Sequence, residues 1–354
     1  MKNSMISIKS VLFVGATLFS LTSFAGNEDR VGSAGATQLL VNPWARSAAL
    51  GDAGVASSNG LEATFLNIAG LATLDKTQIK FNYSNWMGNA GISFNSAGIA
   101  QRVSESDVIA VSIQSMNFGD IPITTVANPE GNIGFFSPRS NIFSLGYARA
   151  FSSSISAGIN LKIISESISN LSTSGVALDA GIRYVTGENE KIKFAISLKN
   201  IGPVMHYKGD GLAQQVSYIS NESIASLEER SATFELPSLL SVGGSYDIIL
   251  DPKNKLNIAL GFTANSFMKD QYRIGFDYGM TNNKYAFNIR AGYCYEKDIR
   301  DEVNASNALV GPSFGFSIDA LVGKNKNALG LEYCTRLAGI FGLIHTFGLT
   351  ISLK

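Results

Sequence analysis

From Thr77 onward, the chain is built of stretches of about ten residues in which apolar and polar side chains alternate, each followed by a turn. Between residues 285 and 296, tyrosine, phenylalanine, isoleucine and alanine occupy every second position, and mostly polar residues or glycine stand between them. The same period of two holds at 192–199, 272–279 and 347–354. Because successive side chains of a strand point to opposite faces, each stretch predicts a strand with one apolar and one polar face.

The pattern predicts fourteen strands, an even number. Their expected bounds are 77–86, 90–102, 107–116, 140–151, 154–165, 174–186, 190–200, 236–249, 254–266, 271–281, 284–296, 312–322, 327–335 and 343–354.

The predicted links alternate in length. Every second link is a turn of two to four residues, whereas the links at 117–139, 201–235 and 297–311 are long. Short periplasmic turns opposite long outer loops are typical of bacterial outer-membrane barrels, whose N-terminus lies on the periplasmic side. A secreted β-sandwich also alternates apolar and polar residues, but fourteen strands would be unusual for one sandwich. We therefore predict an all-β fold, a 14-stranded antiparallel transmembrane β-barrel over residues 77–354 whose apolar face meets lipid.

Charge and composition fit this class of protein. The chain has 28 basic and 28 acidic residues, so no net charge indicates a nucleic-acid partner. Charged residues make up 16%, below the roughly 25% of soluble domains, and glycine reaches 35 residues. The composition therefore indicates a glycine-rich β-protein rather than a disordered chain.

The first 25 residues have the features of an export signal. Lys2 and Lys9 precede an apolar run at 11–21, and Ser23-Phe24-Ala25 has the small-x-small form of a cleavage site. A first transmembrane helix is the alternative, but the run is short of the about 20 residues that a spanning helix needs. We expect residues 1–25 to be cleaved and the mature chain to be a multi-pass protein of the outer membrane.

Residues 26–76 show no strand alternation and are rich in small residues. Gly51, Gly54, Gly60 and Gly70 would permit tight turns and close backbone contacts. We expect this segment to be a short plug packed inside or under the barrel.

Two short motifs in this segment resemble those of a known family. "ARSAALGDAGVA" followed by "FLNIAGLA" resembles the N-terminal signature of the FadL-like outer-membrane barrels, and "NPWARSAALGDAGVA" is similar to the PorV/PorQ family of the type IX secretion system. Ile68 replaces the usual proline, which leaves open whether the branch is PorV, PorQ or another. The motif contains Arg46, Gly51, Asp52, Asn67 and Gly70, and we expect Asn67 to hold the plug turn through hydrogen bonds.

The resemblance implies a non-enzymatic component of type IX secretion. Such a protein would bind secreted cargo through the cargo's C-terminal signal domain, dock beside the large translocon barrel and pass the cargo to the surface attachment complex, where a separate sortase does the chemistry. One alternative is a FadL-like transporter of hydrophobic small molecules, which would need an apolar lumen and a lateral opening. A second is a general porin, against which the expected plug argues.

Apolar residues in two outer loops are the candidate partner surface, because exposed apolar patches mark interaction sites. The alternative is that these residues fold over the lumen or contact the outer leaflet. The candidates are Phe118, Ile121, Pro122, Phe135, Phe136, Leu337, Ile340 and Phe341, together with Ile123 and Leu343 beside them.

No catalytic or metal-binding motif is visible. His206 and His345 stand outside any recognisable motif, and the chain has no HExxH, CxxC, phosphate-binding loop or GxSxG. We expect no enzymatic activity, no cofactor and no metal. Cys294 and Cys334 are expected to be free thiols in the lumen, since one strand separates theirs and the distance would exceed the about 7 Å limit for a disulfide.

Overall fold

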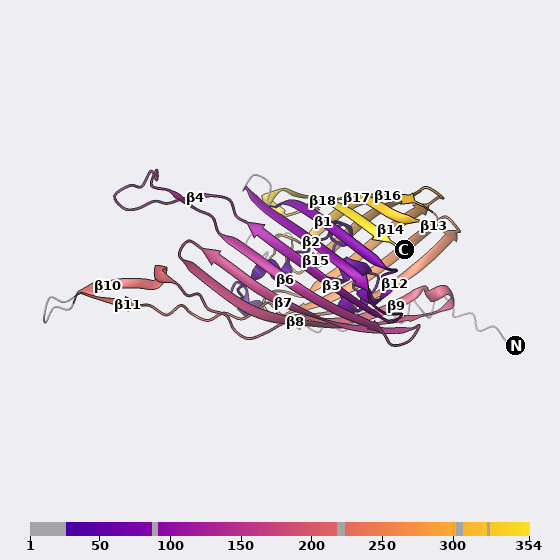
Figure 1. The fold of residues 1–354 in the computed structure, drawn as a ribbon, viewed down its shortest axis with the longest axis horizontal. Coiled ribbons are helices and arrows are strands. Elements are labelled where there is room, and N and C mark those ends of the chain that lie inside the picture. The colour runs from indigo at the N-terminus through magenta and orange to yellow at the C-terminus, as the bar shows by residue number, and fades with distance from the viewer. Residues whose placement is uncertain (1–25, 87–90, 218–223, 300, 302–306, 324–325) are drawn as a thin grey trace.

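A computed structural model describes residues 26–354, except 87–90, 218–223, 300, 302–306 and 324–325. The expected export signal, residues 1–25, lies outside the described residues. Fourteen antiparallel strands form a closed barrel in which β1 pairs with β18 (Figure 1), so the predicted fold class is confirmed. In chain order the strands are β1 (Thr77–Trp86), β2 (Ile92–Arg102), β3 (Asp107–Asn117), β6 (Arg139–Ala150), β7 (Ile155–Ile168), β8 (Leu171–Thr186), β9 (Ile192–Ile201), β12 (Leu239–Asp251), β13 (Asn254–Asn265), β14 (Gln271–Thr281), β15 (Tyr285–Glu296), β16 (Gly311–Val322), β17 (Asn327–Leu337) and β18 (Leu343–Leu353).

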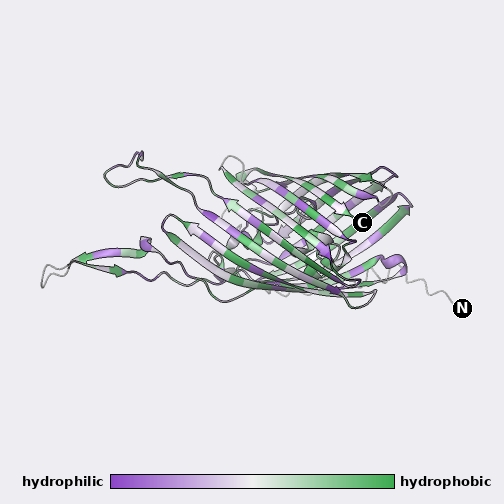
Figure 2. Ribbon diagram, in the orientation of Figure 1, coloured by the Kyte–Doolittle hydropathy of each residue, from purple (hydrophilic) through white to green (hydrophobic). Residues whose placement is uncertain are grey.

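The period of two in the sequence becomes the two faces of the barrel wall. Along β6, buried and exposed residues alternate from Arg139 to Arg149, and the hydrophobic bands on the ribbons in Figure 2 follow the same pattern. On β1, Phe81 is 51% exposed whereas its neighbour Lys80 is 1% exposed. The apolar side chains therefore cover the outside and most charged strand residues point into the lumen, as closure within lipid requires.

Aromatic side chains gather on the outer surface near both barrel ends. At the end with the long loops, Tyr272 packs against Phe262 and Tyr295, with ring centroids 5.2 Å and 6.5 Å apart. At the end with the short turns, Tyr184 and Tyr285 are exposed. Aromatic residues at both interfaces are a property of membrane-spanning barrels.

The N-terminal segment, residues 26–76, runs through the lumen. Its short helices are η1 (Glu28–Arg30), η2 (Thr37–Leu40), α2 (Ala45–Ala49), η3 (Gly60–Thr64) and η4 (Ile68–Thr73). None of the helices in the described part of the chain is long and apolar enough to cross a membrane. The chief contacts are those of η4 with β6 and β7 and those of α2 with β16 and β17.

The N-terminal segment crosses the lumen from one end of the barrel to the other. Strand β1 begins at the short-turn end as expected, where Lys76 O accepts a hydrogen bond from Arg102 N at 2.7 Å. Gly26, however, lies at the other end, where a Cβ on it would be 2.8 Å from Met268 O in the long-loop-side link between β13 and β14. The segment therefore enters at the long-loop end and leaves at the short-turn end.

Small inward-facing side chains on the strands make room for this segment. Trp44, Leu61 and Leu71 have no exposed surface and belong to an apolar cluster that includes Ala100 on β2 and Ala148 on β6. Burying a large apolar side chain contributes roughly 1.5–3 kcal/mol. The main core of the protein thus lies between the N-terminal segment and the inner face of the wall.

Two hairpins extend beyond the barrel at the long-loop end (Figure 1). In the link between β3 and β6, β4 (Ile121–Pro122) pairs with β5 (Phe135–Phe136). In the link between β9 and β12, β10 (Ala213–Ser217) pairs with β11 (Ile224–Glu228) after η7 (Asp210–Leu212). The remaining short helices are η6 (Glu188–Glu190) and η8 (Gly339–Phe341).

Candidate functional site

Buried ion pairs hold the N-terminal segment against the strands. Arg46 on α2 donates to Asp319 Oδ1 on β16 at 2.5 Å and to Glu332 Oε1 on β17 at 2.7 Å. Lys80 Nζ on β1 lies 2.5 Å from Glu62 Oε1 on η3 and 3.1 Å from the same Glu332 oxygen. Burial alone would lower the pKa of Arg46, but Glu332 and Asp319 outweigh it and raise that pKa. These pairs tie α2 and η3 to three strands, β16, β17 and β1.

A second charged contact is made by Asp52, directly after a tight turn. Its carboxylate lies 3.0 Å from Arg336 Nη2 on β17 and accepts from Asn42 Nδ2 at 2.5 Å. Burial alone would raise the pKa of Asp52, but Arg336 and Arg273 together hold it below the usual range. Asp52 has φ +60°, a conformation that only a short polar residue or glycine adopts readily. The Asp52 carboxylate thus joins the N-terminal segment to β17.

Glycines allow the segment to touch the wall at backbone distance. Gly51 has φ +62°, and a Cβ on it would lie 3.0 Å from Tyr293 N. On the strand side, a Cβ on Gly292 would lie 2.1 Å from Leu50 C. Neither neighbour is the end of a flexible side chain, so a larger residue at Gly292 could be accommodated only by moving the backbone.

Asn67 joins η4 to the strands. Its Oδ1 accepts from Ala69 N at 3.1 Å and caps η4, and its Nδ2 donates to Ile182 O on β8 at 3.2 Å. A Cβ on Gly181 would lie 2.1 Å from Asn67 Oδ1, and one on Gly70 would lie 2.2 Å from Ser58 O. The structure therefore places both sequence-predicted residues, Asn67 and Gly70, at close contacts of the segment.

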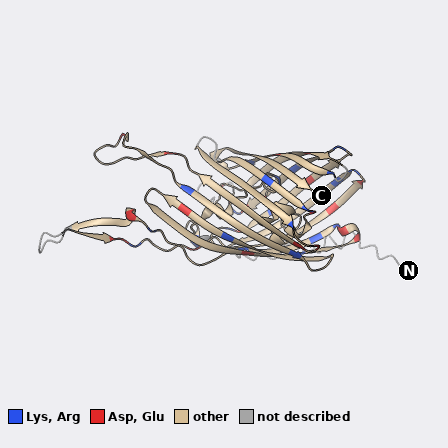
Figure 3. Ribbon diagram, in the orientation of Figure 1, with Lys and Arg blue, Asp and Glu red and all other residues tan. Residues whose placement is uncertain are grey.

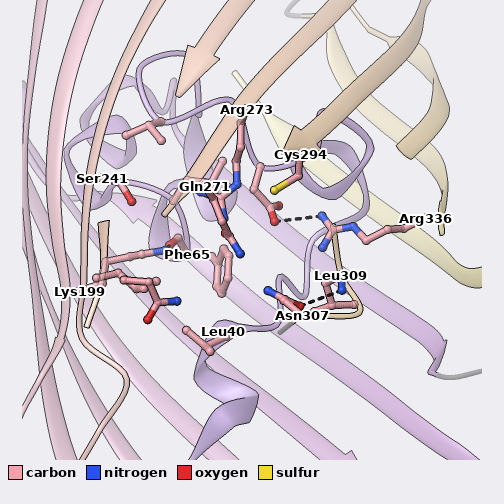
Figure 4. A pocket seen from close by; sticks show the side chains of 15 residues that line it. Leu40, Phe65, Lys199, Ser241, Gln271, Arg273, Cys294, Asn307, Leu309 and Arg336 are labelled. Carbon is pink, nitrogen blue, oxygen red and sulfur yellow. Dashed lines mark hydrogen bonds and ion pairs between the residues drawn. The ribbon is translucent and has the colours of Figure 1, made fainter. Parts of the chain in front are cut away.

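Two cavities lie on either side of the N-terminal segment. The long-loop-side cavity is about 40 Å³ and is lined by polar residues such as Gln271 and Arg273 as well as by Phe65 and Leu239. Figure 4 shows Lys199 and Ser241 facing Arg273 and Cys294 across it, with the Asp52–Arg336 ion pair drawn as a dashed line.

The short-turn-side cavity is larger, about 640 Å³. Its lining includes charged residues from the strands and hydroxyl or amide side chains from the N-terminal segment, among them Lys193, Asp247, Lys255, Ser58 and Asn59. Figure 3 shows the charged positions on the strands as isolated bands between uncharged stretches. Neither cavity has the apolar lining that a tunnel for hydrophobic molecules would need.

The first predicted loop cluster lies on the β4–β5 hairpin and its base. Phe135 is 68% exposed, Ile121 pairs with Phe136, and Pro122 is exposed beside them. Phe118 lies at the base, where its backbone N donates to Pro138 O at 3.2 Å. Most of this apolar surface is uncovered within the described structure.

The second predicted loop cluster joins β17 to β18. Leu337 and Leu343 pair across the two strand ends and both are exposed, as is Phe341 on η8. The side chain of Ile340 lies outside the described residues. The structure therefore places two separate apolar groups at the long-loop end, on β4–β5 and on the β17–β18 link.

Sequence reasoning missed the second hairpin and the contacts that hold its base. Val216 and Leu227 are exposed on β10 and β11, but this part of the sequence was expected only to be a long link. At the base, Tyr207 Oη donates to Glu166 Oε2 at 2.6 Å, and burial together with this bond raises the pKa of Tyr207. The short runs AQQVS at 213–217 and IASLE at 224–228 do not alternate apolar and polar residues, so the local pattern carried no strand signal there.

His345, Cys294 and Cys334, the residues considered for chemistry, lie among side chains that have structural roles. His345 Nδ1 lies 2.8 Å from Tyr333 Oη, and their rings stack on the outer surface. Cys294 and Cys334 are buried free thiols, as predicted. Among the described residues, no group of three His, Cys, Asp or Glu side chains could hold a metal ion.

Solved structures with a similar fold include a monoaromatic hydrocarbon channel, a toluene transporter and a FadL homologue. The TodX deltaS2S3 mutant monoaromatic hydrocarbon channel is 10% identical, with 87% of this chain and 97% of that chain covered and a TM-score of 0.56. The toluene transporter TodX of Pseudomonas putida is 10% identical, with coverages of 88% and 97% and a TM-score of 0.54. A FadL homologue from Pseudomonas aeruginosa is 12% identical, with coverages of 85% and 95% and a TM-score of 0.50. At these identities the likeness concerns the fold alone.

The closed barrel and its apolar exterior define the class of protein, a membrane-type β-barrel whose fold is similar to that of these neighbours. A comparison with curated proteins found no match. The family model of the type IX secretion system protein PorV matches residues 24–268. The chain therefore belongs to the PorV family, whose members take part in type IX secretion, and both family and fold are those of secretion or transport barrels.

Proposed function

We propose that this chain is a multi-pass outer-membrane component of the type IX secretion system that binds secreted cargo by its C-terminal signal domain. It receives cargo from the translocon barrel and passes it to the attachment complex, where a separate sortase modifies it. In this proposal residues 1–25 are a cleaved signal, residues 26–76 plug the lumen and residues 77–354 form the barrel in outer-membrane lipid. The chain itself catalyses no reaction.

The observation that carries the proposal is the exposed apolar surface of the β4–β5 hairpin above a lumen filled by residues 26–76. A small apolar molecule would need a path through the barrel, but charged pairs and close glycine contacts occupy its middle. A protein partner needs no such path and could bind at the exposed surface of the β4–β5 hairpin. Phe135, Ile121 and Val126 expose large apolar areas there, as partner-binding residues do before their partner covers them.

The alternative, a FadL-like transporter of hydrophobic small molecules, has the fold likeness in its favour. The polar linings of both cavities argue against it. Growth on long-chain fatty acids or aromatic hydrocarbons, with and without the gene, separates the two functions. A growth defect together with normal cargo export would favour the transporter.

The experiment is cargo capture in a deletion strain complemented with variants. Phe135→Ser combined with Ile121→Ser should reduce co-purification of cargo carrying the C-terminal signal and reduce its display at the cell surface. Val103→Ser makes the same kind of change at an exposed position in the short turn between β2 and β3, and it should leave both readouts unchanged. Normal cargo export in the deletion strain, together with no co-purification of cargo with the unmodified barrel, would overturn the proposed function.

A further inference from the structure

The first residues after the expected export signal lie across two links at the long-loop end of the barrel. Arg30 pairs with Glu235 in the β9–β12 link at 2.6 Å, and its guanidinium carbon lies 4.1 Å from the centre of the Phe267 ring in the β13–β14 link. Gly35 N donates to Glu235 O at 3.1 Å. These contacts hold residues 26–35, here called the strap, at a fixed place on the barrel rim.

Gly26, the first residue of the strap, lies against two oxygen atoms of the β13–β14 link. A Cβ on Gly26 would lie 2.8 Å from Met268 O and 3.0 Å from Asp270 Oδ1. Both distances are too short for a carbon atom, but they are normal for hydrogen bonds donated by nitrogen. The third neighbour, Asp270 N at 2.9 Å, is a donor, so a nitrogen at this point is held from the side of the two oxygens.

The backbone nitrogen of Gly26 can reach this point only in a cleaved chain. A rotation of about 120° about the Cα–C bond exchanges the nitrogen with the position of the Cβ, and glycine has no side chain to prevent it. In the uncleaved chain the same rotation would carry residues 1–25 with it. After cleavage nothing precedes the nitrogen, so the rotation is free.

Cleavage also gives this nitrogen its charge. In the uncleaved chain it is an uncharged amide with one hydrogen. Hydrolysis of the Ala25–Gly26 bond by a signal peptidase and water leaves a carboxylate on Ala25 and an amine on Gly26, and the amine takes up a proton near neutral pH. The resulting ammonium group has three hydrogens to donate, and a carboxylate and a carbonyl oxygen are suitable acceptors for it.

The neighbouring side-chain cations are paired with other carboxylates. Arg30 pairs with Glu235, and Lys269 Nζ lies 2.8 Å from Asp298 Oδ2. Asp270 has two carboxylate oxygens that can accept several hydrogen bonds at once, so it can bind an ammonium group in addition to other donors. Because Asp270 Oδ1 is buried, salt screens its attraction for a cation less than it would at the open surface.

We propose that removal of the signal creates an ammonium group on Gly26 that binds Asp270 Oδ1 and Met268 O and thereby locks the strap onto the barrel rim. The site for this group is built into the β13–β14 link and stays empty until the signal is removed. The inference rests on the proposed cleavage after Ala25. It goes beyond the secretion function, because it concerns how the N-terminal segment is fixed in the mature barrel.

The first test is the reactivity of the Gly26 amine in the mature barrel, purified in detergent. An amine-reactive ester near neutral pH is the probe, and mass spectrometry of the N-terminal peptide measures the labelling rate. Asp270→Asn should raise this rate about tenfold, because a hydrogen bond to a charged group is lost. Asp29→Asn, which removes an exposed carboxylate from the same strap, is the matched control and should leave the rate unchanged.

The second test separates the ion pair from a general effect on folding. Chains that begin at Gly26 or at Ala25 are refolded in phospholipid vesicles, each with and without Asp270→Asn, and are unfolded in urea. The extra residue moves the ammonium group away from the site. It should therefore lower the urea midpoint when Asp270 is present, and it should have no effect in the Asp270→Asn variant.

Three results would each overturn the proposal. The mature protein may be found by N-terminal sequencing to begin elsewhere than at Gly26, Asp270→Asn and Asp29→Asn may label alike, or the two changes may lower the urea midpoint additively. If Asp270→Asn does not fold, the chains that begin at Gly26 and Ala25 are compared directly, and equal midpoints overturn the proposal. Cargo capture is not among these readouts, so this proposal and the proposed secretion function fail independently.

Discussion

The substitution Arg46→Met tests whether buried ion pairs fix the N-terminal segment inside the barrel. Arg46 is the cation that pairs with Asp319 in the described structure, and it shares Glu332 with Lys80. The substitution leaves Asp319 without a cation, whereas Glu332 keeps Lys80 at 3.1 Å. Removing one partner of a buried pair costs about 3–5 kcal/mol. Because Glu332 keeps Lys80 as its cation, we expect the free energy of unfolding to fall by an amount near the lower end of this range, about 3 kcal/mol.

The assay is urea unfolding of the barrel in phospholipid vesicles, followed by tryptophan fluorescence. Trp44 is completely buried next to α2 and reports on the segment directly. Arg30→Met is the matched control, because the Arg30–Glu235 pair at 2.6 Å has side chains that are 37% and 55% exposed. Such an exposed pair contributes less than about 1 kcal/mol.

A second variant separates lost charge compensation from lost packing. Arg46→Met combined with Asp319→Asn should recover part of the stability, since no unpaired carboxylate is left in the lumen. If Arg46→Met unfolds at the same urea concentration as Arg30→Met, the reasoning is refuted and the segment is held by apolar contacts alone.

Three further predictions follow from the same contacts. Gly292→Ala should destabilise the barrel by about 1–3 kcal/mol, because the added methyl group overpacks against the backbone of the N-terminal segment. Gly244→Ala is the control and should not destabilise the barrel, because a Cβ there meets no atom nearer than 3.7 Å. Equal denaturation midpoints for the two variants would contradict this prediction. Asp52 has a folded pKa below its unfolded value of about 3.9, so its contribution is fully present above that pH and is lost as the pH falls through the folded pKa. Asp52→Asn should remove this part of the acid dependence of the unfolding free energy, and an unchanged pH profile would refute its role. Cys294 and Cys334 should react with maleimide only after unfolding, and rapid labelling of the folded barrel would show that the lumen is open to the reagent.

The strands could be predicted because each carries its own signal. On β15, six alternating apolar residues predict a two-faced strand without any knowledge of its neighbours. The end of a strand was harder to predict where the chemistry of a single residue decides it. The eighth strand was expected from 236, but β12 begins at Leu239, because Pro237 has no backbone N–H for the ladder and its carbonyl accepts from Asn200 Nδ2 at 3.0 Å.

The candidate sites could be predicted only in part, because their contacts join residues that are far apart in the chain. In the lumen, Lys162 on β7 pairs with Asp179 on the neighbouring strand β8 at 2.7 Å. The local sequence pattern gives no sign that Arg46 contacts Asp319, which lies 273 residues later in the chain. The path of residues 26–76 through the lumen likewise depends on tertiary packing.

The most direct test of the account is photo-crosslinking in living cells from a photoreactive amino acid placed at Phe135. The account predicts crosslinks to secreted proteins that carry the C-terminal signal domain, with few or none from the same amino acid at Val103. If positions 135 and 103 give equal crosslinks to cargo, or position 135 gives none while export proceeds, then cargo does not bind at the β4–β5 hairpin and the account is contradicted.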